Sequence, residues 1–349
     1  MRLRLIYSGG TIGSAGQPLE PLQAAEFHAL WDRHVAPRLG EAELVWHWLD
    51  PPLLSSELVP ADWGRLARLV LGADEDAVLL LHGTDTMAWT AAALAFLLTL
   101  YAADGTPRGR FARPVVLTGA QRPLFEGDGL RPGTDALENL RTALNAAALG
   151  RREVIVAFGS LSLRGPRVMK MSTRDDRAFT CPKGSTPAAP LPEATAAALT
   201  AQLDRLAPHL GARAVLTVTA SPTEAAQLVR QLEAIIDAMD DKLGAIHLLG
   251  YGTGNFPARS ALTPLLRALH DRGVVLVAGS QVPHGAVDPA AYGAGHWLTD
   301  CGALSAADMT GASVHAKLHV GLALAATHGW QRVDMERFFL TPVAGERRT

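Results

Sequence analysis

The chain has 349 residues, of which 48% are hydrophobic and 19% charged, and its formal net charge is -2. This length and composition predict a globular protein with a large core and more than one domain. The near-neutral charge, without a long run of one sign, excludes an extended electrostatic surface for nucleic acid or an anionic membrane. It favours a small neutral or zwitterionic ligand.

The N-terminus and the cysteines indicate the compartment. The first strand-like segment reaches a glycine turn too soon to hold a signal peptide, and no apolar run is long enough to cross a bilayer. Cys181 and Cys301 lack the spacing of a metal site or a disulfide framework. We therefore expect a cytoplasmic protein with reduced thiols, no membrane contact and no nucleic-acid partner.

Two glycine-threonine turns each follow an apolar strand-like run. Residues 3–7 lead into Ser8-Gly9-Gly10-Thr11-Ile12-Gly13, and residues 78–81 lead into His82-Gly83-Thr84-Asp85-Thr86. Ligands of an open α/β sheet collect at the carboxyl ends of its strands, where glycines let backbone N–H groups approach them closely. The two turns therefore predict one active site, with Gly10 and Gly83 beside the substrate.

The residue types in these turns favour amide hydrolysis. A threonine hydroxyl attacks only when a base takes its proton, and the candidates for that chemistry are Thr11, Thr84, Asp85 and Lys170. We expect Thr11 to be the nucleophile and Lys170 to relay a proton from Thr84, with Asp85 orienting the lysine or binding a substrate ammonium group. Backbone N–H groups near Thr84 and Ala120 are expected to stabilise the oxyanion.

Strand and helix signals alternate along the rest of the chain. They predict an α/β fold with a larger N-terminal domain, built on a mainly parallel sheet with helices on both faces, and a smaller C-terminal α/β domain. We expect the domains at 1–185 and 213–349, joined by a proline- and alanine-rich connection at 186–212. The first half should include strands at 114–118 and 153–158, a helix at 88–100, and a helix at 135–149 capped by Asp135. The second half should include strands at 214–219, 244–249 and 274–278, and helices at 224–238 and 260–271.

Taken together, the motifs resemble the bacterial-type L-asparaginases over most of the chain. Besides the two turns and Lys170, the matching segments are Thr118-Gly119-Ala120-Gln121, Gly250-Tyr251-Gly252-Thr253-Gly254-Asn255, Val287-Asp288-Pro289-Ala290-Ala291-Tyr292-Gly293 and Ala307-Asp308-Met309-Thr310. The C-terminal segments resemble the cytoplasmic type I branch. The resemblance implies hydrolysis of L-asparagine to L-aspartate and ammonia through an acyl-enzyme. One methylene group is worth only about 1–3 kcal/mol of discrimination, so we also expect minor glutaminase activity. The missing metal-binding motifs predict that no metal or cofactor takes part.

The resemblance also implies roles for individual residues. It makes Thr11 the primary nucleophile, makes Thr84, Asp85 and Lys170 a second catalytic group, and makes Asp85 the anchor of the substrate amino group. Ser55 and Ser56 match the segment that holds the substrate carboxylate. Asn255 matches a residue that reaches a neighbouring subunit's site, which implies a homodimer or homotetramer.

The chain departs from the family pattern in two places. Family members usually carry a tyrosine in the loop after the first threonine, but residues 14–22 contain none, and the nearest tyrosine is Tyr7. Glu20 or a water molecule is a candidate substitute for activating Thr11. The segment Ser280-Gln281-Val282 lacks the cysteine of the effector segment in some type I enzymes, so we make no prediction of allosteric regulation.

Other interpretations remain open. Each of these features also has a common structural role when it is taken alone. This applies to a threonine in a Gly-Gly-Thr turn, to an aspartate before a helix, to a lysine among arginines and to hydroxyls in a loop. A metal hydrolase and a nucleotide-binding enzyme are disfavoured because their motifs are missing. The alternatives for the whole chain are a weak homologue that binds or senses asparagine or aspartate, and an ammonia-releasing amidotransferase subunit.

Overall fold

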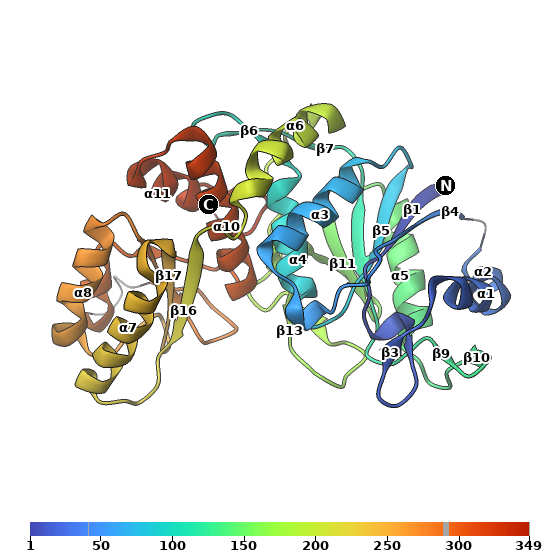
Figure 1. Cartoon of the computed structure of the whole chain (residues 1–349), viewed down its shortest axis with the longest axis horizontal. Coiled ribbons are helices and arrows are strands. Elements are labelled where there is room, and N and C mark those ends of the chain that lie inside the picture. The colour runs from blue at the N-terminus through green and yellow to red at the C-terminus, as the bar shows by residue number, and fades with distance from the viewer. Residues whose placement is uncertain (41, 289–292, 349) are drawn as a thin grey trace.

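A six-stranded sheet forms the centre of the N-terminal domain (Figure 1). The structure is a computed structural model that describes residues 1–40, 42–288 and 293–348. Adjacent strands run parallel except for the antiparallel pair of β11 and β12. The strand order is β12 (Leu161–Arg164), β11 (Val154–Phe158), β8 (Val115–Thr118), β5 (Ala77–Leu81), β1 (Arg2–Tyr7) and β4 (Glu43–Trp48).

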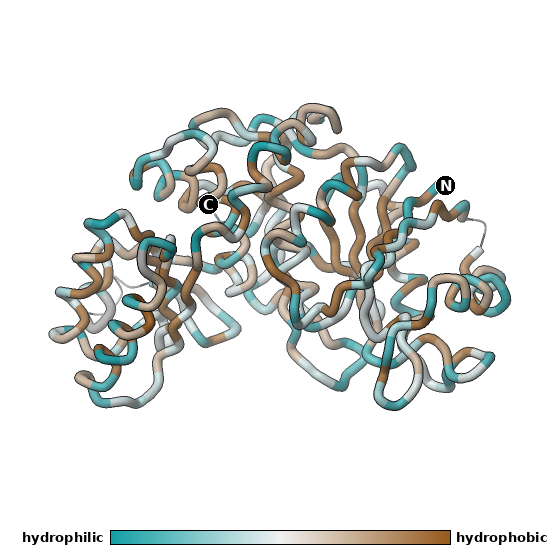
Figure 2. Tube along the Cα trace, viewed as in Figure 1, coloured by the Kyte–Doolittle hydropathy of each residue, from teal (hydrophilic) through white to brown (hydrophobic). Residues whose placement is uncertain are grey.

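Helices cover both faces of this sheet, which explains its continuous apolar strands. In β5, Leu79 and Leu81 face a core cluster that includes residues of α1 (Ala24–His34) and α5 (Ala136–Ala148). The intervening Val78 and Leu80 face a second cluster with α3 (Pro60–Leu71) and α4 (Met87–Leu97). Because a central strand is buried on both faces, every position of β5 is apolar. Figure 2 shows the sheet as a hydrophobic centre between more polar segments.

The C-terminal domain repeats the strand-and-helix pattern around a smaller parallel sheet. Its helices α7 (Ala225–Met239), α8 (Arg259–Asp271) and α9 (Gly293–Asp300) contribute to the same core cluster as its strands. Figure 1 shows α7 and α8 far from the N-terminal sheet. The strands, in sheet order, are β16 (Ala214–Thr219), β17 (Leu243–Gly250), β18 (Val275–Ser280) and β19 (Leu304–Ser305). The predicted two-part α/β architecture is confirmed.

The C-terminal helices return to the N-terminal domain. Helix α10 (Gly311–His328) packs on α4 and on α6 (Ala196–Leu206), and α11 (Arg332–Leu340) packs on α10. The expected connection at 186–212 therefore contains a helix, and its limits remain a prediction. Within the described ranges, no helix is long and apolar enough to span a membrane.

Short elements complete the fold. The helix expected at 88–100 ends at Leu97, because the chain continues as β6, which pairs with β7. The remaining strands are β2 (Ser14–Ala15), β3 (Glu20–Pro21), β6 (Thr99–Tyr101), β7 (Pro107–Phe111), β9 (Phe125–Glu126), β10 (Gly129–Leu130), β13 (Met169–Lys170), β14 (Phe179–Thr180) and β15 (Glu193–Ala194). The remaining helical segments are α2 (Ala36–Leu39), η1 (Thr11–Gly13), η2 (Ser55–Glu57), η3 (Gly165–Arg167), η4 (Ala207–His209) and η5 (Asp240–Lys242).

Candidate active site

The two glycine-threonine turns touch at the carboxyl ends of β1 and β5. These strands are parallel neighbours, with Tyr7 opposite Leu81. A side chain at Gly10 would place its Cβ only 2.6 Å from the Gly83 Cα, and Gly10 has a φ of 98°. Position 10 therefore requires glycine, both for the close approach of the two turns and for the positive φ angle. The contact brings the Thr11 and Thr84 turns together, as the strand pattern predicts.

Thr11 is the first residue of the short η1 turn, and the side chain of Tyr7 contacts this turn. The Tyr7 hydroxyl donates to the Gly13 carbonyl at 3.4 Å, and a Cβ on Gly13 would lie 2.3 Å from that hydroxyl oxygen. Burial raises the pKa of Tyr7 to about 12, so this phenol is protonated at neutral pH and is unsuited to act as the base for Thr11. Within the described part of the chain, the Thr11 hydroxyl has no hydrogen-bond partner, so it is available to a substrate.

Lys170 joins the second threonine to its neighbouring carboxylate. The Lys170 Nζ donates to Thr84 Oγ1 at 2.8 Å and to Asp85 Oδ1 at 2.9 Å. The lysine lies on β13, which pairs with β14, and its side chain is only 17% exposed. It therefore differs from a lysine on a solvated basic face. Asp85 is 66% exposed, so its carboxylate can contact the lysine and a ligand.

Ser55 lies against the Thr84 turn from the loop after β4. A Cβ on Gly83 would lie 2.3 Å from Ser55 Oγ, so this glycine leaves the space that the serine occupies. The Thr86 hydroxyl donates to the Ser55 carbonyl at 2.7 Å and fixes the loop. Ser56 follows in η2 and is exposed. The contact of Thr86 depends on the tertiary fold, so no local sequence pattern predicts it.

The turn after β8 places Ala120 beside the Thr84 turn. A Cβ on Gly119 would meet the His82 carbonyl oxygen at 2.2 Å, and Ala120 is buried next to it. The turn is held by Asp135, whose carboxylate accepts from the backbone N–H groups of Gln121 at 2.8 Å and Arg122 at 2.9 Å.

The predicted capping role of Asp135 is therefore wrong. Asp135 precedes α5, but its side chain makes no capping hydrogen bond to that helix. The Thr134 hydroxyl instead accepts from the Ala136 N–H at 3.2 Å. The carboxylate of Asp135 also accepts from Asn139 Nδ2 at 3.0 Å, so it links α5 to the turn beside the candidate site. A local cap pattern could not reveal this contact, because it joins segments that are separate in sequence.

His82 is a buried residue that supports the Thr84 turn, a role that no local sequence pattern predicts. Its Nδ1 lies 2.7 Å from the Gly83 carbonyl and its Nε2 lies 3.0 Å from Thr90 Oγ1. Burial lowers the pKa of His82 to about 4, so the ring is neutral near pH 7. A neutral ring can donate to the carbonyl through Nδ1 and accept the threonine hydroxyl through Nε2.

The loop after Thr11 forms the β2–β3 hairpin. Glu20 lies opposite Ala15 in this hairpin and is exposed. The hairpin follows Thr11 directly in the chain, but among the described residues no hydrogen bond or ion pair joins Glu20 to Thr11. The substitution of Glu20 for the missing loop tyrosine therefore remains a prediction.

Asn255 lies apart from the other candidates, in the C-terminal domain. Its backbone pairs with Tyr251 just after β17, and none of its contacts in the described ranges joins it to Thr11 or Thr84. In the matching segment at 287–293, positions 289–292 lie outside the described residues. Across the described residues, no group of three or more His, Cys, Asp or Glu side chains could hold a metal ion.

Comparison with known protein families identifies the family to which this chain belongs. The N-terminal asparaginase domain family matches residues 2–195, and the glutaminase/asparaginase C-terminal domain family matches residues 230–339. The chain belongs to the asparaginase family. This asparaginase-family chain is thus an amidohydrolase, and the resemblance expected from its motifs is confirmed.

Individual relatives agree with this assignment. The chain is 31% identical to L-asparaginase 1 of Escherichia coli K12, with 90% of this chain and 89% of that protein covered. It is also 29% identical to the L-asparaginase of Thermococcus kodakarensis, covering 91% of this chain and 92% of that protein. The solved structure of the thermostable L-asparaginase from Thermococcus kodakarensis has the same fold, with a TM-score of 0.76, 24% identity and full coverage of both chains.

Proposed function

We propose that this asparaginase-family chain hydrolyses the side-chain amide of L-asparagine to L-aspartate and ammonia, with minor activity on L-glutamine. The observation that carries the proposal is the position of Lys170 Nζ, within 2.8 Å of Thr84 Oγ1 and 2.9 Å of Asp85 Oδ1. This group lies beside the turn that carries Thr11. A hydroxyl nucleophile next to a proton-transferring group is the arrangement that acyl transfer requires.

In the first half of the proposed reaction, Thr11 Oγ1 attacks the amide carbon of the substrate. A C–O bond forms, the C–N bond breaks, and the hydroxyl proton passes to the nitrogen that leaves as ammonia. Backbone N–H groups at Thr84 and Ala120 stabilise the negative charge that develops on the carbonyl oxygen. Glu20 or a water molecule carries the proton away from Thr11, in place of the family's loop tyrosine.

In the second half, water attacks the aspartyl ester on Thr11. Thr84 and Lys170 orient this water and transfer its proton, while Asp85 holds the lysine in place. The water oxygen joins the acyl carbon, the proton returns to the Thr11 oxygen, and L-aspartate leaves. The enzyme is thereby restored without a metal or cofactor.

The substrate is held at both of its charged ends. Asp85 Oδ1 contacts Lys170 at 2.9 Å, and the exposed remainder of the Asp85 carboxylate suits the substrate ammonium group. The hydroxyls of Ser55 and Ser56 suit the α-carboxylate. Gly10 and Gly83 allow the substrate to approach the backbone closely.

We further propose a cytoplasmic homodimer or homotetramer. Asn255 lies in the C-terminal domain, apart from the Thr11 turn, which suits a residue that completes the site of a neighbouring subunit. The low cysteine content suits a reducing compartment.

Ammonia release from L-asparagine and L-glutamine tests the function. We expect turnover of asparagine, with glutamine slower by about 10–200-fold, the discrimination expected for one methylene group. Thr11→Ala should lower turnover by about 1,000-fold or more. The matched control, Thr106→Ala, changes an exposed threonine and should remain close to wild type. Asparagine binding without ammonia release would contradict the proposal and favour a sensing homologue.

A further inference from the structure

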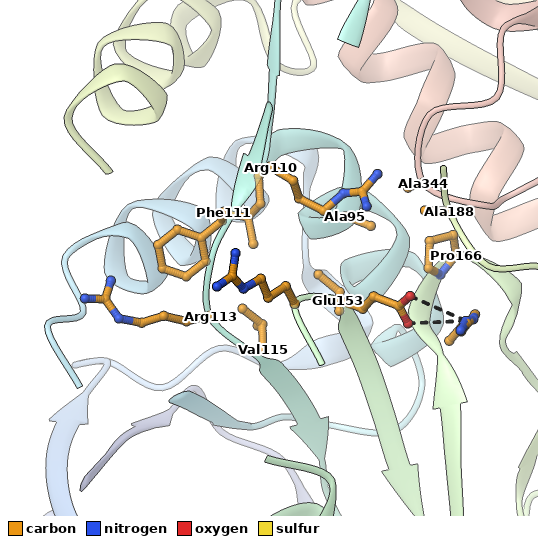
Figure 3. Close-up of a pocket in the computed structure, with 13 residues that line it drawn as sticks. Ala95, Arg110, Phe111, Arg113, Val115, Glu153, Pro166, Ala188 and Ala344 are labelled. Atoms are coloured by element: carbon orange, nitrogen blue, oxygen red, sulfur yellow. Dashed lines mark hydrogen bonds and ion pairs between the residues drawn. The ribbon is translucent and has the colours of Figure 1, made fainter. Parts of the chain in front are cut away.

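A groove lined by arginines lies at the opposite end of the sheet from the Thr11 turn. It consists of two adjoining pockets at the amino ends of β8 and β11, next to β7. Figure 3 shows Arg110, Phe111 and Arg113 on this side of the domain, with Glu153 joined to a neighbouring guanidinium. The arginine groove is defined by Arg110, Arg113, Arg151, Arg152 and Arg164.

The acidic residues of the lining only partly balance these charges. Arg164 pairs with Glu153 at 3.3 Å, and Arg152 pairs with Glu193 at 3.5 Å. The second pair joins two exposed side chains, so it contributes little free energy. The other three arginines have no carboxylate within 4.0 Å among the described residues. The groove therefore carries a net positive charge, which Glu153, Glu193 and, at longer range, Glu346 balance only in part.

Several of these guanidinium groups are held in place. Arg110 Nη2 donates to the Val343 carbonyl at 2.9 Å, and the Arg113 guanidinium lies over the Phe111 ring at 5.7 Å. Burial lowers the pKa of Arg110 below its usual value, which reflects the cost of keeping its charge away from water. Arg164 Nε is buried without a partner in the part of the chain that the structure describes. An anion in the groove would provide acceptors for the exposed N–H groups of Arg151 and Arg152.

The dimensions of the groove limit its occupant. The wide part has a volume of about 630 Å³, within the range of about 300–1,000 Å³ for small-molecule sites. The recess beside Phe111 has a volume of about 20 Å³, enough for a water molecule but not for a large apolar group. A compact, highly charged ligand therefore suits the wide part.

We propose that the arginine groove binds a small anion that carries two or more phosphate groups. Guanidinium groups match phosphate oxygens in pairs, and the groove offers several of them at different places along its length. A single phosphate would contact only part of this set. The site is separate from the proposed asparagine site, because it is built on the amino ends of β8 and β11, whereas the threonine turns follow the carboxyl ends of β1 and β5 in the same sheet.

Calorimetric titration with pyrophosphate and with ATP tests this proposal. The variant R151Q/R152Q removes two exposed charges from the wide part of the groove without changing the partly buried Arg110. The control variant R259Q/R267Q removes two exposed arginines from α8, which gives the same change in net charge. Circular dichroism establishes that both variants are folded before the titration.

We expect saturable binding to the wild-type protein that weakens about tenfold or more in R151Q/R152Q. Binding should remain within about twofold of wild type in R259Q/R267Q, and should weaken with added salt. Tighter binding of ATP would assign the ligand to the nucleotides, and equal binding would assign it to free polyphosphates. The absence of saturable binding, or equal weakening in both variants, would overturn the proposal whether or not the protein hydrolyses asparagine.

Discussion

The ammonium group of Lys170 lies 2.8 Å from the hydroxyl oxygen of Thr84, although the two residues are 86 positions apart. The same ammonium group contacts Asp85 at 2.9 Å, so the lysine links a hydroxyl to a carboxylate at the end of β5. The proposed second half of the reaction depends on this link.

Replacing Lys170 by methionine should therefore reduce catalysis. Lys170→Met removes the group that holds Thr84 and transfers its proton, and we expect kcat to fall by about 100–10,000-fold. Steady-state ammonia release measures the effect. Lys242→Met, which changes an exposed lysine of η5, serves as the control. A Lys170→Met enzyme within twofold of wild type would exclude the lysine from the mechanism.

Replacing Ser55 should mainly affect substrate binding. Ser55→Ala removes a hydroxyl proposed to contact the α-carboxylate, and a hydrogen bond to a charged group contributes about 1.5–3 kcal/mol. We expect KM for asparagine to rise about 10–100-fold with a smaller change in kcat, as steady-state kinetics would measure. Ser260→Ala alters an exposed serine of α8 and should leave KM unchanged. A loss confined to kcat would instead assign Ser55 to the chemical step.

Acid should destabilise the fold through His82. Its folded-state pKa of about 4 lies below the unfolded value of about 6.5, so the unfolded state binds the extra proton between these pH values. The free energy of unfolding therefore falls as pH drops from about 6.5 to 4, by about 3 kcal/mol from this residue. Above pH 6.5 both states are neutral and the effect is absent.

Denaturant unfolding at several pH values measures this dependence. The slope of the free energy of unfolding against pH should be smaller in His82→Gln between pH 6.5 and 4. The reduction should be up to about 1.4 kcal/mol per pH unit, the value for one proton. The control is His284→Gln, which changes an exposed histidine. Buried His247 and His319, whose pKa values burial lowers to about 3, should keep part of the slope in the variant. An unchanged slope in His82→Gln would contradict the assignment.

The buried pair of Lys317 and Glu346 should stabilise the C-terminal segment. Lys317 Nζ lies 2.5 Å from Glu346 Oε1, and both side chains are inaccessible to solvent. The Glu346 carboxylate also accepts from the backbone N–H groups of Val343 and Ala344. Glu346→Gln leaves the lysine charge buried without its counter-charge, so we expect it to lower the free energy of unfolding by about 3–5 kcal/mol.

Urea unfolding of single and double variants measures whether the loss of stability comes from the unpaired lysine charge or from other effects of the substitution. The double variant Lys317→Met/Glu346→Gln removes both charges and should recover part of the stability lost in Glu346→Gln. Glu233→Gln, at an exposed position of α7, should have little effect. A double variant less stable than Glu346→Gln would show that an unpaired charge is not the cause.

The sequence predicts the meeting of the threonine turns for a simple geometric reason. Both turns follow buried parallel strands, and the carboxyl ends of such strands share one edge of a sheet. The strand pattern therefore places Gly10 and Gly83 at the same edge, and the pairing of β1 with β5 brings them into contact. The position of Lys170 depends instead on how β13 pairs with β14, so the sequence names this lysine as a candidate base but does not determine where it lies.

Other contacts could not be predicted because they arise between distant segments. Asp135 fits a local cap pattern, but its carboxylate binds the turn at Gln121 and Arg122. The arginine groove likewise joins residues from β7, from the loop before β11 and from the end of β12. In the sequence these arginines look like ordinary surface charges, because their shared cavity exists only in the folded chain.

The most direct test of the proposed mechanism is to trap the acyl-enzyme. The wild-type protein and Thr84→Ala are mixed with L-asparagine, quenched in acid, digested and analysed by mass spectrometry. The mechanism predicts an aspartyl ester on the peptide that contains Thr11, accumulating more in Thr84→Ala because water attack is slowed. An ester on another residue, or an ester that still forms in Thr11→Ala, would contradict the assignment of Thr11 as the nucleophile.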